Sequence, residues 1–129
     1  MSSAGEPYSY VLLRVVPRIE RGEQLNVGAA VFCRGQRWLR AKVVIDAPRL
    51  LALDPQLDLP ALRRQLDGLV RVADGDSAAG RVAGMEPADR FGFIAAPSST
   101  SVQPSAVHTG LCEAPEQVLD ALIARYVLV

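Results

Sequence analysis

Long hydrophobic runs are absent from this sequence of 129 residues, where apolar stretches such as Val43-Val44-Ile45 stop after a few positions. A helix that crosses a bilayer needs about 20 consecutive apolar residues, so we expect no membrane contact. The first six residues have no basic region followed by an apolar one, which predicts a chain without a secretory signal peptide.

Cysteine and lysine are both scarce. Two cysteines in a chain without a signal peptide predict reduced thiols and a cytoplasmic location. Lys42 is the only lysine, against thirteen arginines. Arginine binds carboxylate and phosphate better than lysine does, but genome base composition can produce the same bias.

Charge of one sign does not dominate, since Lys+Arg and Asp+Glu each number 14. Eight of the basic and four of the acidic residues lie in 1–49, giving +4, and the remainder of the chain carries −4. A nucleic-acid-binding domain is usually markedly basic, so neutrality argues against that class. The length and the 50% apolar content predict a single domain over 1–129, ordered over 7–128 and flexible over 1–6, that needs no metal or disulfide to fold.

Strands are predicted first along the chain. Residues 8–16 are aliphatic, aromatic and β-branched, which is typical of a central strand, and a polar loop follows over 19–25. Residues 27–33 and 38–45 form a hairpin around Arg34-Gly35-Gln36-Arg37, with a two-residue Gly-Gln turn that places Cys33 opposite Trp38.

The hairpin register divides its side chains between two faces. One face is apolar, and we expect helices to cover it: Gly28, Ala30, Phe32, Leu39, Ala41, Val43 and Ile45. The other face is mixed and is expected to be half-exposed: Ala29, Val31, Cys33, Trp38, Arg40 and Lys42.

Helices are predicted later in the chain. Asp58 is a candidate N-cap with Pro60 behind it, and helical spacing follows from Leu59 to Ala73. A second helix opens at Pro115. Segment 48–53 is predicted as a helical turn, 74–84 and 97–101 as loops, 86–95 as ambiguous, and 102–110 as a last strand at a sheet edge. The order predicts an α+β fold, with a mainly antiparallel sheet of about four strands and two main helices packed on one face.

The run Arg21-Gly22-Glu23-Gln24-Leu25-Asn26-Val27-Gly28 stands between the first strand and the hairpin. This Arg-Gly-Glu-x-x-Asn-Val-Gly pattern resembles the hallmark of a bacterial family known as domain of unknown function 3037. The opening strand, the Phe91-Gly92-Phe93 region and the closing helix are similar to that family too. The resemblance implies no activity, cofactor or catalytic residue. Some relatives are encoded beside HipA-like kinases, which implies such a kinase as one candidate partner.

The motif allows two interpretations. In one it is a structural latch, in which Gly22 takes a positive φ angle, Asn26 caps a turn and Gly28 permits close backbone approach. In the other, Arg21, Glu23 and Asn26 face a ligand or partner, because loops on rigid strands often carry function.

Catalytic and metal motifs are missing. His108 and Cys112 would lie about 13 Å apart on one extended strand, too far for a nucleophile and its base unless a bend at Gly110 brings them closer, which nothing in the sequence requires. Together with Cys33 they lack the paired spacing that structural zinc sites use. We therefore expect no catalytic residue, metal or cofactor.

The basic hairpin, defined by Arg34, Arg37, Trp38, Arg40 and Lys42, is the other candidate surface. We expect a noncatalytic protein-interaction module, because exposed tryptophan and arginine are favoured interface anchors. Nucleic-acid or anion binding by the same hairpin is one alternative, and an enzyme built around Arg21, Glu23 and Asn26 is another. A homo-oligomer with Val31, Cys33 and Trp38 at its interface also stays open.

Overall fold

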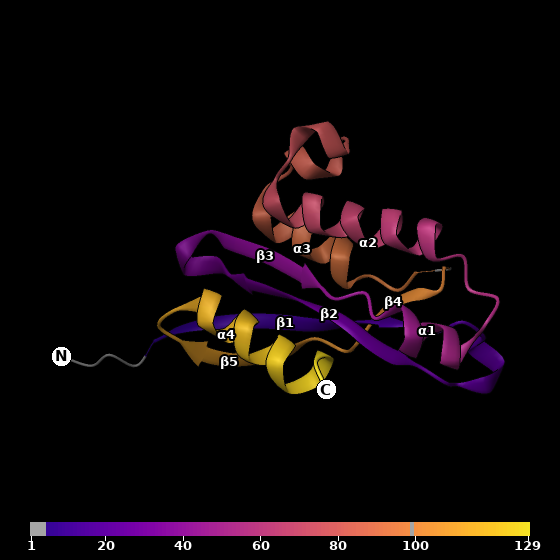
Figure 1. Ribbon diagram of the computed structural model, residues 1–129. Coiled ribbons are helices and arrows are strands. Elements are labelled where there is room, and N and C mark those ends of the chain that lie inside the picture. Colours follow the sequence, from indigo (N-terminus) through magenta and orange to yellow (C-terminus); the bar gives the residue numbers. More distant parts are fainter. Residues whose placement is uncertain (1–4, 99) are drawn as a thin grey trace.

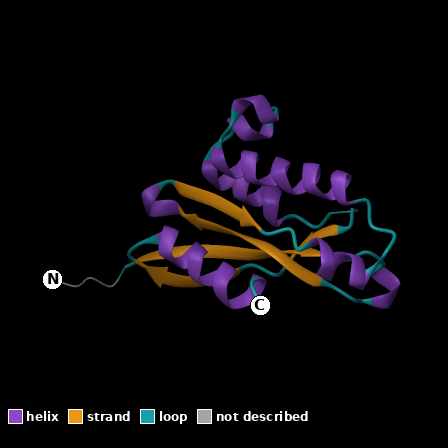
Figure 2. Cartoon of the chain, viewed as in Figure 1, coloured by secondary structure: helices purple, strands orange, loops and turns teal. Residues whose placement is uncertain are grey.

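Strand β1 (Glu6–Val15) is central in the sheet, because segments far apart in the sequence pair with its two edges. Along one edge it pairs antiparallel with β2 (Leu25–Cys33), which in turn pairs with β3 (Trp38–Val43). Along the other edge it pairs with β4 (Val102–Pro104) and then with β5 (His108–Cys112), both antiparallel. The sheet order is β3-β2-β1-β4, with β5 continuing the edge that β4 begins (Figures 1 and 2).

The computed structural model describes residues 5–98 and 100–129. Residues 1–4, within the segment expected to be flexible, and Ser99, within the loop expected over 97–101, lie outside the described residues. Glu6 already belongs to β1. None of the helices in the described part is both long and apolar enough to cross a bilayer.

The hairpin register is confirmed, but its predicted turn is wrong. Cys33 pairs with Trp38, and the alternation continues to Gly28 and Val43. The chain reverses through a 3-10 turn, η2 (Arg34–Gln36), and Arg37 takes the left-handed conformation with φ 49°. Gly35 does not supply the positive φ, and a Cβ at that position would meet only the end of the flexible Glu6 side chain, which can move away.

Helices cover both faces of the sheet, which corrects the expectation of two helices on one face. Helices α2 (Leu59–Asp74) and α3 (Pro87–Ala95) lie on the face that carries Phe32 and Leu39. Helix α4 (Pro115–Leu122) and the π-helical turn η5 (Ile123–Val127) lie on the other (Figure 1). The reason is an apolar strip of Leu12, Ala29 and Val31 on that second face, which would otherwise meet water.

Capping explains where the main helix begins and ends. The Asp58 carboxylate accepts a hydrogen bond from Ala61 N–H at 3.1 Å, and Pro60 lies in the first turn. Gly75 ends the helix with φ 73°. The Arg90 guanidinium of α3 then donates to the carbonyls of Val72 and Ala73, which fixes α3 against the end of α2.

Short elements fill the connections. The helical turn expected over 48–53 is α1 (Ala47–Leu53), and the ambiguous segment 86–95 is α3. The loop expected over 74–84 contains two 3-10 turns, η3 (Ser77–Ala79) and η4 (Val82–Gly84), and another, η1 (Ile19–Arg21), follows β1. The last predicted strand is two strands, interrupted where the Ser105 hydroxyl accepts the Leu12 N–H at 2.8 Å.

Candidate functional site

The first half of the loop motif is an exposed ion pair on a left-handed turn. Gly22 has φ 70°, which confirms its predicted conformation. Arg21 Nε donates to Glu23 Oε1 at 2.7 Å, and Nη2 to Oε2 at 3.3 Å. This hydrogen bond from the Arg21 guanidinium lowers the pKa of Glu23 and raises the pKa of Arg21. Both charged groups are therefore already satisfied by each other.

The second half of the motif points elsewhere. A β-bulge between β1 and β2 places Asn26 opposite Arg14, on the α4 side of the sheet. The Asn26 amide oxygen accepts from Arg14 Nε at 3.2 Å, and its amide nitrogen donates to the Tyr126 carbonyl at 3.2 Å. Asn26 thus joins β1, β2 and η5. The interpretation in which Arg21, Glu23 and Asn26 face one ligand would require Asn26 to point toward the other two side chains, and it does not.

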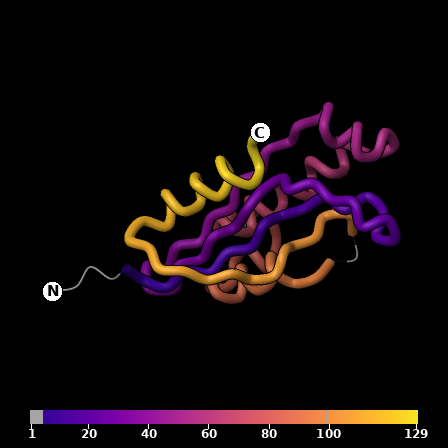
Figure 3. The backbone as a smooth tube through the Cα atoms, turned by 90° about the horizontal axis from the view of Figure 1, so that it is seen from below, coloured from indigo at the N-terminus to yellow at the C-terminus, as the bar shows by residue number. Residues whose placement is uncertain are grey.

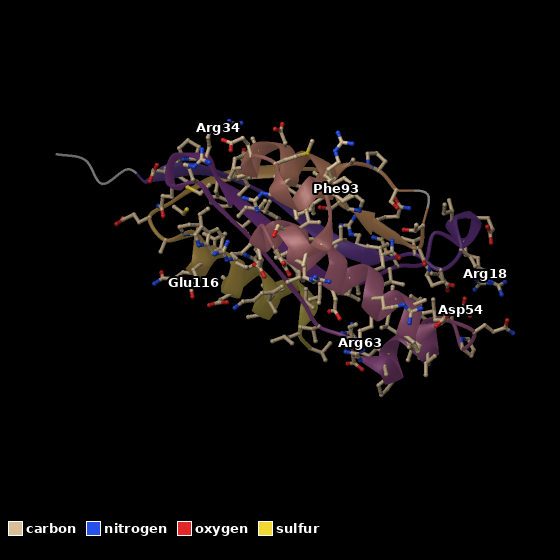
Figure 4. All side chains as sticks on the ribbon, turned by 90° about the horizontal axis from the view of Figure 1, so that it is seen from above. Arg18, Arg34, Asp54, Arg63, Phe93 and Glu116 are labelled. Carbon is tan, nitrogen blue, oxygen red and sulfur yellow. The ribbon has the colours of Figure 1, made fainter. Side chains whose placement is uncertain are left out.

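Gly28 provides close strand approach. A Cβ at this position would lie 2.5 Å from the Lys42 carbonyl oxygen and 2.9 Å from a methyl of Val43. Gly22, Asn26 and Gly28 therefore have structural roles, whereas Arg21 and Glu23 border a shallow polar hollow of about 300 Å³ between η1 and the end of α1. Arg18 and Asp54 lie at the same end of the molecule (Figure 4).

Acidic side chains from other elements offset much of the positive charge of the basic hairpin. Arg37 pairs with Glu86 at 3.2 Å, Arg40 with Asp74 at 3.5 Å, and Lys42 with Asp120. All of these groups are exposed, so the pairs add little stability. They do place an acidic group beside three of the four cations, which weakens the support for nucleic-acid binding.

Of the two remaining hairpin residues, Arg34 stays exposed beside an aromatic ring, whereas Trp38 packs against a helix. The Arg34 guanidinium lies 5.4 Å from the centre of the Phe32 ring. Trp38 is half-buried against the α4 cluster, with the Arg40 guanidinium 5.9 Å from its ring centre. The face expected to be left half-exposed is thus covered by α4 over β2 and β3, although Arg40 and Lys42 reach solvent at the sheet edge.

Helix α4 leaves the β1 and β5 side of this face uncovered (Figure 3). We call the group displayed there the tyrosine surface: Tyr8, Tyr10, His108, Arg125 and Tyr126. The Tyr10 ring stacks on His108 at 5.1 Å and on Tyr8 at 6.3 Å, and the Arg125 guanidinium lies 5.3 Å from the Tyr126 ring centre.

Electrostatics connect the members of the tyrosine surface. Partial burial raises the pKa of the Tyr10 phenol, the neighbouring Tyr126 and Tyr8 phenols add to the increase, and Arg125 opposes it. The sequence signal for part of the surface was the alternation Tyr8-Ser9-Tyr10, which places both rings on one face of a strand. Sequence reasoning missed the site, because His108, Arg125 and Tyr126 reach it only through tertiary packing.

The surroundings of the two cysteines give little support to a catalytic role for them. His108 and Cys112 lie at opposite ends of β5, and His108 is stacked on Tyr10. Burial, and then the neighbouring Cys33, raises the pKa of the Cys112 thiol, which leaves less of the reactive thiolate near neutral pH. Within residues 5–98 and 100–129, no three His, Cys, Asp or Glu side chains gather as a metal site would require.

An apolar hollow of about 540 Å³ lies between α2, α3 and β4, beside Phe93 (Figure 4). No ionisable side chain is among the described residues that line it: Leu13, Gln65, Gly68, Leu69, Val72, Ala79, Phe93, Ile94, Ala96, Pro97, Ser98, Val102 and Pro104. It offers van der Waals contact without acid–base groups.

These features define a small α+β protein with an antiparallel five-stranded sheet and helices on both faces. Its polar-aromatic tyrosine surface lies beside the edge strand β5. A family model described as protein of unknown function (DUF3037) matches residues 10–127, and the chain belongs to that family. Searches of curated proteins and of solved structures found no match.

Proposed function

We propose that this chain is a noncatalytic protein-interaction module that docks a partner protein on its tyrosine surface. The observation that carries the proposal is the grouping of Tyr8, Tyr10, His108, Arg125 and Tyr126 where α4 leaves the sheet uncovered. Tyrosine and arginine are enriched among residues that dominate binding energy, because each combines a large contact area with polar groups at its tip.

The residues at the apolar hollow and at the Arg21–Glu23 loop support a noncatalytic role, because neither place is well suited to acid–base catalysis. Among the described residues that line it, the apolar hollow beside Phe93 has no ionisable group to move a proton. The Arg21–Glu23 pair is closed on itself and leaves its carboxylate at a lowered pKa, which makes Glu23 a poor general base near neutral pH.

The test compares matched charge reversals on the two sides of the molecule. Full-length protein is used as bait in an extract of the native host, and captured proteins are identified by quantitative mass spectrometry. The affinity of each purified candidate is then measured for the wild type and for the variants Arg125→Glu, His108→Ala and Arg63→Glu. Arg63 is exposed on α2 and makes no side-chain hydrogen bond or ion pair among the described residues, so its reversal is the control (Figure 4).

We expect Arg125→Glu, and separately His108→Ala, to weaken partner binding by about tenfold or more, as loss of an interface anchor does. Arg63→Glu should leave the affinity unchanged. A partner that binds all three variants as tightly as the wild type uses another surface, and that result would reject the tyrosine surface as the docking site.

The family resemblance supplies one named candidate for this partner, a HipA-like kinase in a bacterial cytoplasm. Titration of the purified kinase against the same variants applies the test to a defined protein. Binding that depends on Arg125 supports both the site and this partner, whereas no binding leaves the kinase out.

A further inference from the structure

Strand β5 presents an unpaired edge to the outside of the sheet. Leu12 of β1 exchanges hydrogen bonds with Ser105, so the even-numbered residues of β1 direct their backbone groups toward the β4 and β5 edge. The register then pairs Tyr10 with His108 and Tyr8 with Gly110. By alternation, the N–H and C=O groups of Thr109 and Leu111 point away from β1. No strand lies on that side among the described residues.

Strand β5 itself lacks the charges and prolines that commonly oppose edge-to-edge association. Natural edges are blunted by lysine, by proline or by inward-pointing charges. The opposite edge strand β3 carries Arg40 and Lys42, and β4 ends in Pro104. Residues 100–112, by contrast, contain no Asp, Glu, Lys or Arg, and no proline lies within β5.

Exposed apolar side chains lie along the same strand. Leu111 is 65% exposed, and Val107, which directly precedes β5, is 49% exposed. The odd-numbered positions of β5 lie on the α2 and α3 side of the sheet. The even-numbered positions lie on the tyrosine side, where His108 stacks on Tyr10 and the Tyr8 ring covers Gly110.

We propose that a second copy of this chain pairs with β5, antiparallel about a twofold axis at Thr109. In this register Thr109 lies opposite its own copy, Leu111 lies opposite Val107, and His108 lies opposite Gly110. The strand is thus self-complementary: apolar meets apolar, threonine meets threonine, and no like charges are opposed. Two five-stranded sheets become one continuous sheet.

The pairing also joins the two tyrosine surfaces. His108 of one copy lies opposite the Gly110 that is covered by Tyr8 of the other copy, so both polar-aromatic groups meet across the axis. The pairing depends on the free strand edge and not on the proposed partner docking, so each can fail without the other.

The experiment measures mass in solution by light scattering and sedimentation, from low to high micromolar concentrations of the full chain. We expect a dimer for the wild type and a monomer for Leu111→Lys, because a lysine on the edge opposes strand addition. Ile19→Lys is the matched control, since Ile19 is also an exposed apolar residue but lies in η1; it should remain dimeric.

A second variant keeps the test independent of surface charge. Thr109→Pro removes an N–H that β1 does not use, so the sheet should persist by circular dichroism while the dimer is lost. Thr109→Cys, in a background of Cys33→Ala and Cys112→Ser, should form an intermolecular disulfide on oxidation. Directly opposed hydrogen-bonded residues have Cα atoms about 5.5 Å apart, within disulfide range.

A wild type that is monomeric at every concentration would overturn the proposal. A dimer that survives Leu111→Lys and gives no cross-link at position 109 would overturn it as well, because such a dimer uses another surface. Neither result would alter the Arg125→Glu comparison, which tests partner docking by itself.

Discussion

Replacing Gly28 with alanine tests whether the close approach of β2 and β3 depends on a missing side chain. The added methyl would lie 2.5 Å from the Lys42 carbonyl oxygen, 2.9 Å from Val43 Cγ1 and 3.2 Å from Val43 Cα. Two of these atoms belong to the backbone of β3, so no side-chain rotation removes the overlap. Strand β3 must move away from β2, in a region where both faces are packed.

Overpacking of a well-packed core typically costs about 1–3 kcal/mol, and we expect Gly28→Ala to lower the free energy of unfolding by that amount. Gly68→Ala is the matched control. Gly68 lies in the interior of α2, and a Cβ there meets nothing within 4 Å. Alanine is the better helix former by about 0.5–1 kcal/mol, so this second substitution should stabilise the protein.

Urea unfolding followed by circular dichroism measures both variants against the wild type. The midpoints should move in opposite directions with an unchanged slope, which indicates a change in stability without a change in the surface exposed. Gly28→Ala with the wild-type midpoint would refute the steric argument. If that variant also lost partner binding, Gly28 would be a functional and not a structural part of the motif.

Two further predictions concern the second face. Asn26→Ala removes the amide that joins Arg14 to the Tyr126 carbonyl, and we expect a loss of about 1–2 kcal/mol in urea unfolding; an unchanged midpoint would mean that the bridge contributes nothing. The pKa of Tyr10 is raised above that of a free tyrosine, so the fold favours the neutral phenol. The contribution of this preference to the free energy of unfolding is present below the pKa of the unfolded chain. It is lost as the pH rises through the pKa of the folded protein. Tyr10→Phe should therefore make stability less sensitive to alkaline pH, which urea midpoints measured across the alkaline range would show; a pH dependence identical to that of the wild type would contradict this reasoning.

Local sequence patterns were sufficient for the register of the hairpin, although not for its turn, and for the main helix. Alternation between Gly28 and Val43 determined which side chains share a face, since a register shift of one residue would have buried Arg40. Asp58 and Pro60 located the start of α2, because an N-cap and a first-turn proline act through neighbouring backbone groups. The family motif likewise predicted the left-handed Gly22.

Long-range placement could not be predicted in the same way. The stripe of Leu119, Leu122 and Ile123 indicates an amphipathic helix but does not indicate which face of the sheet the helix covers. Arg40 and Lys42 are the reason why the mixed hairpin face is predicted to be half-exposed. Long cationic side chains on an edge strand can, however, reach solvent beside a row of buried apolar side chains. The tyrosine surface needs contacts across more than 90 residues of sequence, which no local pattern contains.

The two-sided pairing of β1 also has a consequence for the order of events during synthesis. Its first neighbour, β2, emerges soon after it, but the bonds between Leu12 and Ser105 close a separation of 93 positions. Such a distant closure is slow relative to hairpin formation, because the chain entropy lost in closing a loop grows with its length. While a ribosome makes the intervening helices, one flank of the nascent β1 has no strand to bind, and it stays available to any other extended segment nearby until residues 102–112 arrive.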